Sequence, residues 1–239
     1  MSFNATLFIN NRLNKTSITD NRIKSILHYI VDCYDKIIDD KIVYDYSKRG
    51  KVSQENFLRN GLVDDYLRKN LHLLNKGTDE YSIVNKEATE TYLNVNDNLD
   101  HDDPIDIHIV DNGLQTSWGS NSQVYYAIEC KRIKSLSDTT SYVDDIRKFS
   151  ERNYKEARLP FEGQLAFIEN KSLTNTVVKD DINSKLKTHA TVITDKYLSD
   201  IKIHHVNCTY DSVHKKKFGA NEPFSIYHLF FDYSKIVID

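Results

Sequence analysis

The stretch AIECKRI, residues 127–133, places two opposite charges in an otherwise apolar segment. Successive side chains of a strand point to opposite faces, so Glu129 and Lys131 share one face. A charge in a buried strand is costly unless it is paired or bound to something. The two residues therefore form either a salt bridge or one half of a metal-dependent active site, and the surrounding sequence has to decide between them.

The composition favours one large domain, residues 1–239, with a packed core. Of the 239 residues, 39% are hydrophobic and 28% are charged, while Gly (7) and Pro (3) are scarce, which argues against long flexible linkers. The formal net charge of −3 does not point to a nucleic-acid binder. It does not exclude one, because local patches of charge matter more than the sum.

The cysteines and the hydropathy limit the cofactors and the location that we expect. Cys33, Cys130 and Cys208 lie far apart and form no CxxC pair, which argues against a zinc site. Their odd number and the lack of a secretory signal over residues 1–13 indicate a reducing cytoplasm. No apolar run approaches the roughly 18 residues that span a bilayer, so we expect no membrane segment.

Two helices are expected before the first strand, one from residue 19 onward and one after Ser53. Ser53 is suited to cap the second helix, whose apolar stripe includes Leu58 and Leu62. Glu55 lies three residues before Leu58 and so falls on that stripe. It is either an N-terminal acid that interacts favourably with the helix dipole or a functional carboxylate.

The remaining pattern predicts an α/β domain with a mixed sheet that helices cover on both sides. In the segment PIDIHIV, Asp106 and His108 share one strand face and three isoleucines share the other. The further elements that we expect are strands over residues 81–95, 104–110 and 123–133, a loop over 111–123, helices from about 137 to 149, over 161–169 and around 178–186, and strands over 201–206 and 224–233.

A hairpin formed by the second and third strands brings two acids together. If it is centred near Trp118, paired residues have numbers that sum to about 235, so Asp106 falls opposite Glu129. Two carboxylates at paired positions repel each other, and a divalent cation between them, such as Mg²⁺, removes that repulsion. Glu55 would add a third carboxylate, and Lys131 would lie close enough to orient or deprotonate a water molecule.

Asp106 followed by Glu129-Cys130-Lys131 on the next strand resembles the signature of the PD-(D/E)xK nucleases, which have restriction-endonuclease-like folds. Pro104-Ile105-Asp106 stands where the family has the literal Pro-Asp. The helix with Glu55, the strands and the helix after them also come in the family's order. The resemblance covers roughly residues 53–170, which leaves an N-terminal helical extension, residues 1–50, and a strand-rich C-terminal part, residues 190–239.

The resemblance implies a nuclease site that depends on Mg²⁺, with Mn²⁺ as a substitute. Asp106, Glu129 and the Cys130 carbonyl would hold the metal, and Glu55 would join them directly or through water. Lys131 would position the attacking water and stabilise the charge that develops on the phosphate. The expected substrate is DNA, and the most similar members are small bacterial restriction or anti-phage defence nucleases, by analogy only.

Further residues are candidates for the surroundings of this site. Gln164 corresponds to a glutamine that touches the site in some members, but the accompanying tyrosine is missing, and the amide alternatively satisfies a buried neighbour. Asp103 is an alternative metal acid if the strand register differs. The other candidates are His108, Glu87 and Arg132, the histidine pair at 204–205, the basic run at 214–217, and the cations Lys134, Arg147, Lys148 and Arg152.

Three alternatives stay open at this point. The chain is either a nuclease or a non-catalytic subunit that keeps the nuclease fold and binds nucleic acid or a partner protein. RNA is not separated from DNA as the substrate. No P-loop is present, so an ATPase, helicase or sensor is expected on another chain. The aromatic C-terminal strands either form a homodimer surface or cover the core.

Overall fold

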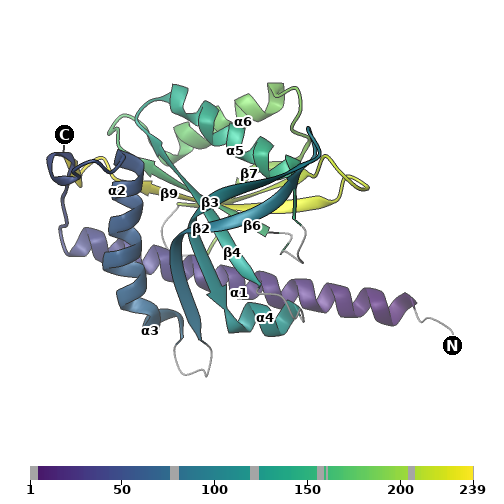
Figure 1. The fold of residues 1–239 in the computed structure, drawn as a ribbon. Helices are drawn as coiled ribbons and strands as arrows, with labels where there is room; N and C mark the ends of the chain where they lie inside the picture. The colour runs from purple at the N-terminus through teal and green to yellow at the C-terminus, as the bar shows by residue number, and fades with distance from the viewer. Residues whose placement is uncertain are drawn as a thin grey trace.

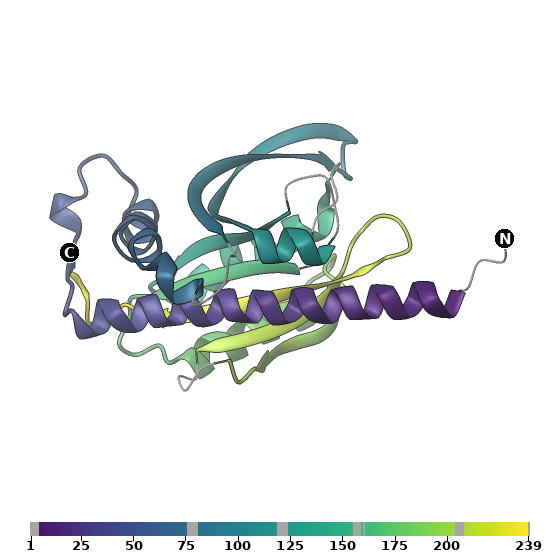
Figure 2. The same cartoon turned by 90° about the horizontal axis from the view of Figure 1, so that it is seen from below.

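The fold is described from a computed structural model that covers residues 5–75, 81–118, 124–154, 159, 161–203 and 208–238 (Figure 1). The long helix α1 (Ala5–Asp39) crosses the width of the sheet (Figure 2). It begins well before residue 19, so the expected helix start there is wrong. No helix within the described ranges is long and apolar enough to cross a membrane.

One mixed sheet of eight strands organises the fold, in the order β5-β2-β3-β4-β6-β9-β8-β7. The pairs β4–β6 and β6–β9 are parallel, and the other neighbours are antiparallel. The strands are β2 (Ser82–Asn94), β3 (Leu99–Asp111), β4 (Tyr125–Ile133), β5 (Arg152–Tyr154), β6 (Phe161–Ile168), β7 (Thr194–Asp200), β8 (Thr209–Lys215) and β9 (Pro223–Asp232).

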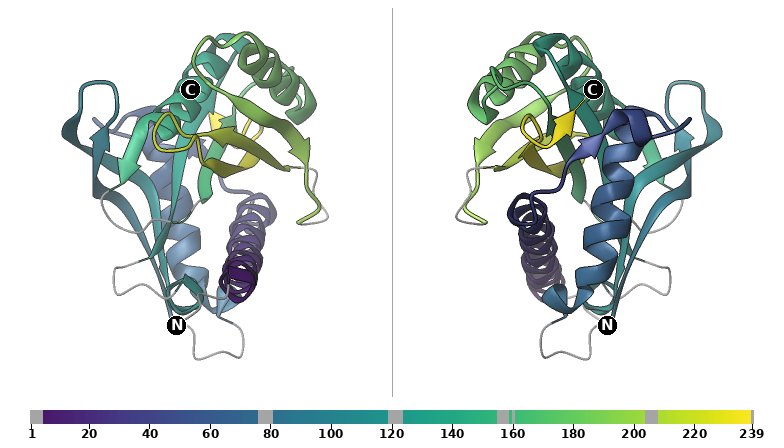
Figure 3. Two further views of the ribbon diagram at one scale, coloured as in Figure 1. Left: turned by 90° about the vertical axis from the view of Figure 1, so that its right-hand side faces the viewer. Right: turned by 90° about the vertical axis from the view of Figure 1, so that its left-hand side faces the viewer.

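Helices cover both faces of this sheet, as the sequence predicts (Figure 3). One apolar cluster joins α1 and the helical run 54–74 to sheet residues such as Ile107, Ile128 and Phe167. A second cluster joins α5 (Thr139–Glu151) and α6 (Asn175–Thr188) to the opposite face, through residues such as Ala166 and Phe230. Because each central strand feeds both clusters, the mixed α/β class of the prediction is confirmed.

The helical run begins with α2 (Gln54–Asn60), which Ser53 caps as expected, since its side chain accepts from the backbone N–H of Asn56 at 3.2 Å. The remaining short elements are a π-helical segment (Gly61–Leu67), α3 (Leu71–Leu74), α4 (Asn112–Trp118), the two-residue strands β1 (Tyr44–Asp45) and β10 (Val237–Ile238), and single helical turns over Tyr46–Lys48, Arg68–Asn70 and Leu136–Asp138.

Three segments differ from the sequence-based expectations. The expected helix at 161–169 is the strand β6, whose eight residues are all buried because both faces and both edges of the strand are covered. The expected loop after residue 111 begins with α4, where Asp111 Oδ1 accepts from the Leu114 N–H at 3.0 Å. The strand expected at 201–206 is absent over the described residues 201–203, which follow β7 directly and precede β8 in the chain.

The aromatic residues of the C-terminal strands are part of the core. Phe224, Tyr227, Phe230, Phe231 and Tyr233 are all buried in the two apolar clusters. These side chains therefore cover the sheet and offer no surface for a homodimer, which corrects one of the two uses considered for them.

Candidate active site

The site lies where β3 leaves β4. The two strands pair from Val110↔Tyr125 to Ile107↔Ile128, so the expected register, with paired numbers that sum to 235, is confirmed. Beyond Ile128, two side chains take over the backbone N–H groups of β4. Asp106 Oδ2 accepts from the Cys130 N–H at 2.8 Å, and Glu55 Oε2 accepts from the Arg132 N–H at 3.1 Å.

The carbonyl of Cys130 belongs to the same edge. In an extended strand the N–H and C=O of one residue point to the same side. Since the Cys130 N–H meets Asp106, its carbonyl also faces the gap between β4 and the departing β3. The thiol itself is buried in the core on the α1 side of the sheet, so the carbonyl is the group of Cys130 that the site can use.

Lys131 is held between two carboxylates that come from two helices. Its Nζ lies 3.1 Å from Asp145 Oδ2 on α5 and 3.7 Å from Glu55 Oε1 on α2. Burial lowers the pKa of Lys131, but Asp145 and Glu55 outweigh this effect and the net shift is upward. Burial also raises the pKa of Glu55, against the opposing effect of Lys131. Lys131 is therefore a cation in this arrangement.

Asp145 was not expected at the site. Its carboxylate is almost fully buried. A signal was available, because Asp145 lies between Tyr142 and Ile146 on the buried stripe of α5. The same reasoning that singles out Glu55 on the stripe of α2 applies to Asp145.

Arg59 is the second residue that the sequence reasoning missed. Its Nη1 donates to Asp106 Oδ1 at 2.8 Å, and its Nη2 donates to Glu87 Oε1 at 2.6 Å. The side chain is only 2% exposed. Arg59 lies four residues after Glu55, so its place on the same helix face is visible in the sequence, although its contact with Asp106 is not.

Glu129 is close to both an acid and a base. Burial, and then the charge of Asp106, raise the pKa of Glu129 to about 8. Arg152 offsets part of this effect, with its Nη1 3.5 Å from Glu129 Oε1. Arg152 also binds Asp103 at 2.8 Å, and Asp103 accepts from the Tyr92 hydroxyl at 2.6 Å. Asp103 is thus committed to a separate contact, as the confirmed register implies.

Gln164 lies on the strand β6 and not on a helix, but it is adjacent to the site. It is in register with Glu129 on the neighbouring strand, so the two side chains share the α5 face. Gln164 is fully buried, and its Nε2 donates to the Tyr142 carbonyl at 2.8 Å. Its Oε1 has no hydrogen-bond partner among the described residues.

Glu87, His108 and Arg132 make other contacts. Glu87 joins the site through Arg59. His108 lies two residues after Asp106, toward the hairpin connection, and its ring packs against Tyr125 with centroids 4.5 Å apart. The Arg132 side chain is on the opposite face from Lys131 and binds Glu169 with two nitrogens, so only its backbone N–H touches the site.

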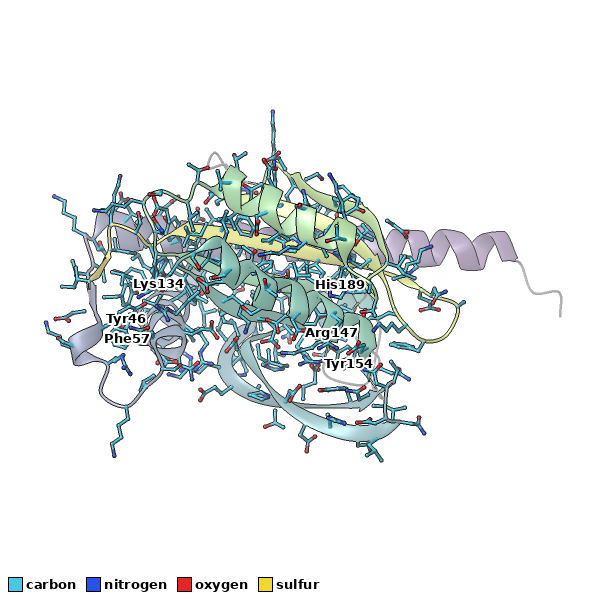
Figure 4. The ribbon with its side chains drawn as sticks, turned by 90° about the horizontal axis from the view of Figure 1, so that it is seen from above. Tyr46, Phe57, Lys134, Arg147, Tyr154 and His189 are labelled. Atoms are coloured by element: carbon cyan, nitrogen blue, oxygen red, sulfur yellow. The ribbon has the colours of Figure 1, made fainter. Side chains whose placement is uncertain are left out.

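The basic residues near the site are mostly paired with acids. Lys134 lies 3.6 Å from Glu169 and over the Tyr46 ring, which Figure 4 shows beside Phe57. Arg147, near the other end of α5, binds Asp144. In the run at 214–217, His214 is buried and Lys217 pairs with Glu151. The histidines at 204–205 lie outside the described residues.

The chemistry of the donors fits a hard divalent cation. Six carboxylates share four cationic partners, which leaves the cluster acidic, and carboxylate and carbonyl oxygens are the ligands that Mg²⁺ prefers. Within the described ranges, however, no three Asp, Glu, His or Cys side chains converge closely enough to hold a metal. The acids are Glu55, Glu87, Asp103, Asp106, Glu129 and Asp145, and the cations are Arg59, Lys131, Lys148 and Arg152.

The geometry of this cluster is the basis on which a function has to be argued. No family model, no curated protein and no solved structure matches this chain.

Proposed function

We propose that the chain is a Mg²⁺-dependent nuclease of the PD-(D/E)xK type that hydrolyses phosphodiester bonds of DNA. The observation that carries the proposal is the meeting of Asp106, Glu129 and Lys131 with Glu55 at the edge where β3 leaves β4. Buried charges that interact strongly in one place are typical of functional sites. A salt bridge kept for stability alone explains the cluster poorly, because buried ion pairs are often no more stable than apolar replacements.

Each residue has a role in this proposal. Asp106, Glu129 and the Cys130 carbonyl would hold the metal, with Glu55 as a direct or water-mediated ligand. A bound divalent ion would lower the pKa of a water molecule and neutralise charge on the phosphate. Lys131 is a cation held by two carboxylates, so it suits the stabilisation of negative charge on the phosphate. A protonated amine cannot take a proton, so we assign it no role as a base.

The connections between the elements support the family resemblance. The helix α2 is followed by three antiparallel strands, then by α5 and the strand β6 parallel to β4. This is the order in which the resemblance places its acid-bearing helix, its two signature strands and the following helix. The restriction-endonuclease-like assignment belongs to the proposal, and the mixed α/β fold is consistent with it.

The substrate and the setting complete the proposal. The carboxylates of the site are partly exposed, 15% for Asp106 and 30% for Glu55, so a phosphate can approach them. Because most nearby basic residues are paired with acids, the electrostatic attraction of this surface for nucleic acid is modest. We therefore propose a cytoplasmic role in defence or restriction, in which a partner such as an ATPase, helicase or sensor delivers the DNA.

A second candidate is a non-catalytic subunit with this fold. The observation that favours it is that Arg59 already neutralises Asp106. Thermal unfolding in Mn²⁺ or Mg²⁺ separates the two, because a ligand that binds the folded state raises its apparent stability. A nuclease site predicts a rise in Tm that Asp106→Asn removes. No rise with either ion would contradict the nuclease.

A further inference from the structure

We infer that Arg59 holds the cation position beside Asp106, and that a divalent ion binds by exchanging with the Arg59 guanidinium. The inference rests on the proposed function in that it concerns the same acids. It assigns a new role to a residue outside the nuclease signature, which is to set the metal affinity of the site.

Both oxygens of Asp106 are in use in this structure. Oδ1 accepts from Arg59 Nη1 at 2.8 Å, and Oδ2 accepts from the Cys130 N–H at 2.8 Å. The Cys130 contact belongs to the backbone of β4 and fixes the carboxylate at the strand edge. Arg59 is therefore the partner that can leave, and its departure frees Oδ1 on the side of the site.

The charges around the site favour the exchange. Arg59 supplies one positive charge to a cluster in which acids outnumber bases, and a divalent ion supplies two. Among the described residues Gln164 Oε1 has no hydrogen-bond partner, although it is fully buried and adjacent to Glu129 on the α5 face, which is consistent with a water molecule or an ion at this position. Buried polar atoms are almost always satisfied by protein, water or an ion.

Arg59 has other hydrogen-bond partners that it can keep when it leaves Asp106. Its Nη2 already donates to Glu87 Oε1 at 2.6 Å and to Asn60 Oδ1 at 3.1 Å. The Glu87 side chain is 52% exposed, so the pair can turn toward solvent together. Released from Asp106, the guanidinium keeps two of its partners and stays near the site.

The backbone at Glu87 fits such a movable contact. Glu87 has φ of 55° inside β2, at the position between the pairs Lys86↔Ile107 and Ala88↔Ile105, opposite Asp106. A left-handed conformation is unfavourable for a residue with a side chain, and such strain persists where the surrounding structure requires it. The residue in this conformation is the one whose carboxylate accepts from Arg59.

The test is Mn²⁺ binding, measured by calorimetry on the purified full-length chain without nucleic acid. Arg59→Met removes the competing cation, so we expect Mn²⁺ to bind about ten- to a hundredfold more tightly, the equivalent of one charge-assisted hydrogen bond. Arg59→Lys keeps the charge but cannot reach Asp106 and Glu87 at once, so its affinity should lie between the two. Arg68→Met, in the same helical run, should leave the affinity unchanged.

A second measurement uses the wild-type chain, in case the Arg59→Met variant does not fold. Mg²⁺ is titrated while the side-chain nitrogen signals of Arg59 are followed by NMR. Exchange predicts that these signals move with the Mg²⁺ concentration and that the signals of Arg68 do not.

The outcomes separate this inference from the proposed function. Equal or weaker Mn²⁺ binding by Arg59→Met would overturn the exchange without contradicting the proposed nuclease. The same holds if the Arg59 signals do not change when Mg²⁺ binds. Mn²⁺ binding by Arg59→Met that exceeds that of the wild type supports it. An absence of binding in the wild type and in both Arg59 variants would overturn the exchange and the proposed metal site together.

Discussion

The backbone N–H of Cys130 donates to Asp106 Oδ2 at 2.8 Å, just beyond Ile107↔Ile128, the last pair of β3 and β4. The carboxylate takes the place of the β3 backbone as the acceptor for this N–H, and Arg59 neutralises the carboxylate from the other side. Asp106 therefore makes structural contacts in addition to its role in the proposed chemistry.

Asp106→Ala should destabilise the metal-free protein by about 3 kcal/mol, because it leaves the buried Arg59 with Glu87 as its only carboxylate partner. Urea unfolding in the presence of a chelator measures this difference. As the matched comparison, Asp106→Ala combined with Arg59→Met should recover part of the loss. Full additivity of the two substitutions would show that the pair contributes nothing.

Glu129→Gln, in contrast to Asp106→Ala, should make the metal-free protein more stable than the wild type. The pKa of Glu129 is raised to about 8 in the folded state by burial and by Asp106, so the folded state binds more protons than the unfolded state between pH 4.5 and 8. Stability of the wild type therefore falls as pH rises through this window.

The glutamine variant lacks this titration, so its advantage over the wild type should grow from pH 5 to pH 8, by at most about 1.4 kcal/mol per pH unit. Chemical unfolding at several pH values without metal measures the gap. A gap that stays constant with pH would mean that Glu129 is ionised in the folded protein throughout.

Asp145→Asn should slow DNA cleavage by about 10²-fold, the order expected when a catalytic group loses its positioning. Asp145 holds Lys131 Nζ at 3.1 Å, and asparagine keeps the shape of the side chain without its charge. The neighbouring Asp144 is the matched control, because it contacts Arg147 and Lys148 on its own helix. If Asp144→Asn lowers kcat as much as Asp145→Asn does, the effect comes from the helix and not from Lys131.

A buried chain of hydrogen bonds on the α5 side predicts acid sensitivity. The Tyr142 hydroxyl meets His228 at 2.9 Å, and Ser212 Oγ lies 2.8 Å from a ring nitrogen of both His228 and His214. Burial lowers the pKa of His214 to about 3 and that of His228 well below its ordinary value.

Both histidines are neutral in the folded protein and gain protons only on unfolding. Protonation therefore favours the unfolded state, so the free energy of unfolding is highest above about pH 6.5 and falls as pH drops toward 3. Each contributes a slope of about 1.4 kcal/mol per pH unit in that window. His214→Gln should make the loss of stability between pH 6.5 and 5 less steep, as measured by urea unfolding. Parallel curves for variant and wild type would contradict the assignment.

The sequence predicts the β3–β4 part of the site well because its signals are local. Alternation along two strands and a hairpin centred near Trp118 determine which residues face each other, so Asp106 falls beside Glu129. Alternation does not identify β6 as a strand, since a strand buried on both faces shows no alternation and its sequence resembles that of a buried helix.

The sequence does not predict Arg59 and Asp145 as site residues, for a different reason. Each acts through a contact with a residue far along the chain, Asp106 and Lys131 respectively, and no spacing in the sequence encodes those distances. The position of each on a buried helical stripe is visible in the sequence, but a charge on such a stripe has no assigned partner until the fold is known.

Cleavage of supercoiled plasmid by the purified chain in Mg²⁺ or Mn²⁺, beside Lys131→Ala and Glu129→Ala, tests the central claim most directly. The proposal predicts cutting that needs the metal and that both substitutions abolish, while the control Asp144→Asn still cuts. Cutting that survives both substitutions, or no cutting by a wild-type chain that binds Mn²⁺, would contradict it.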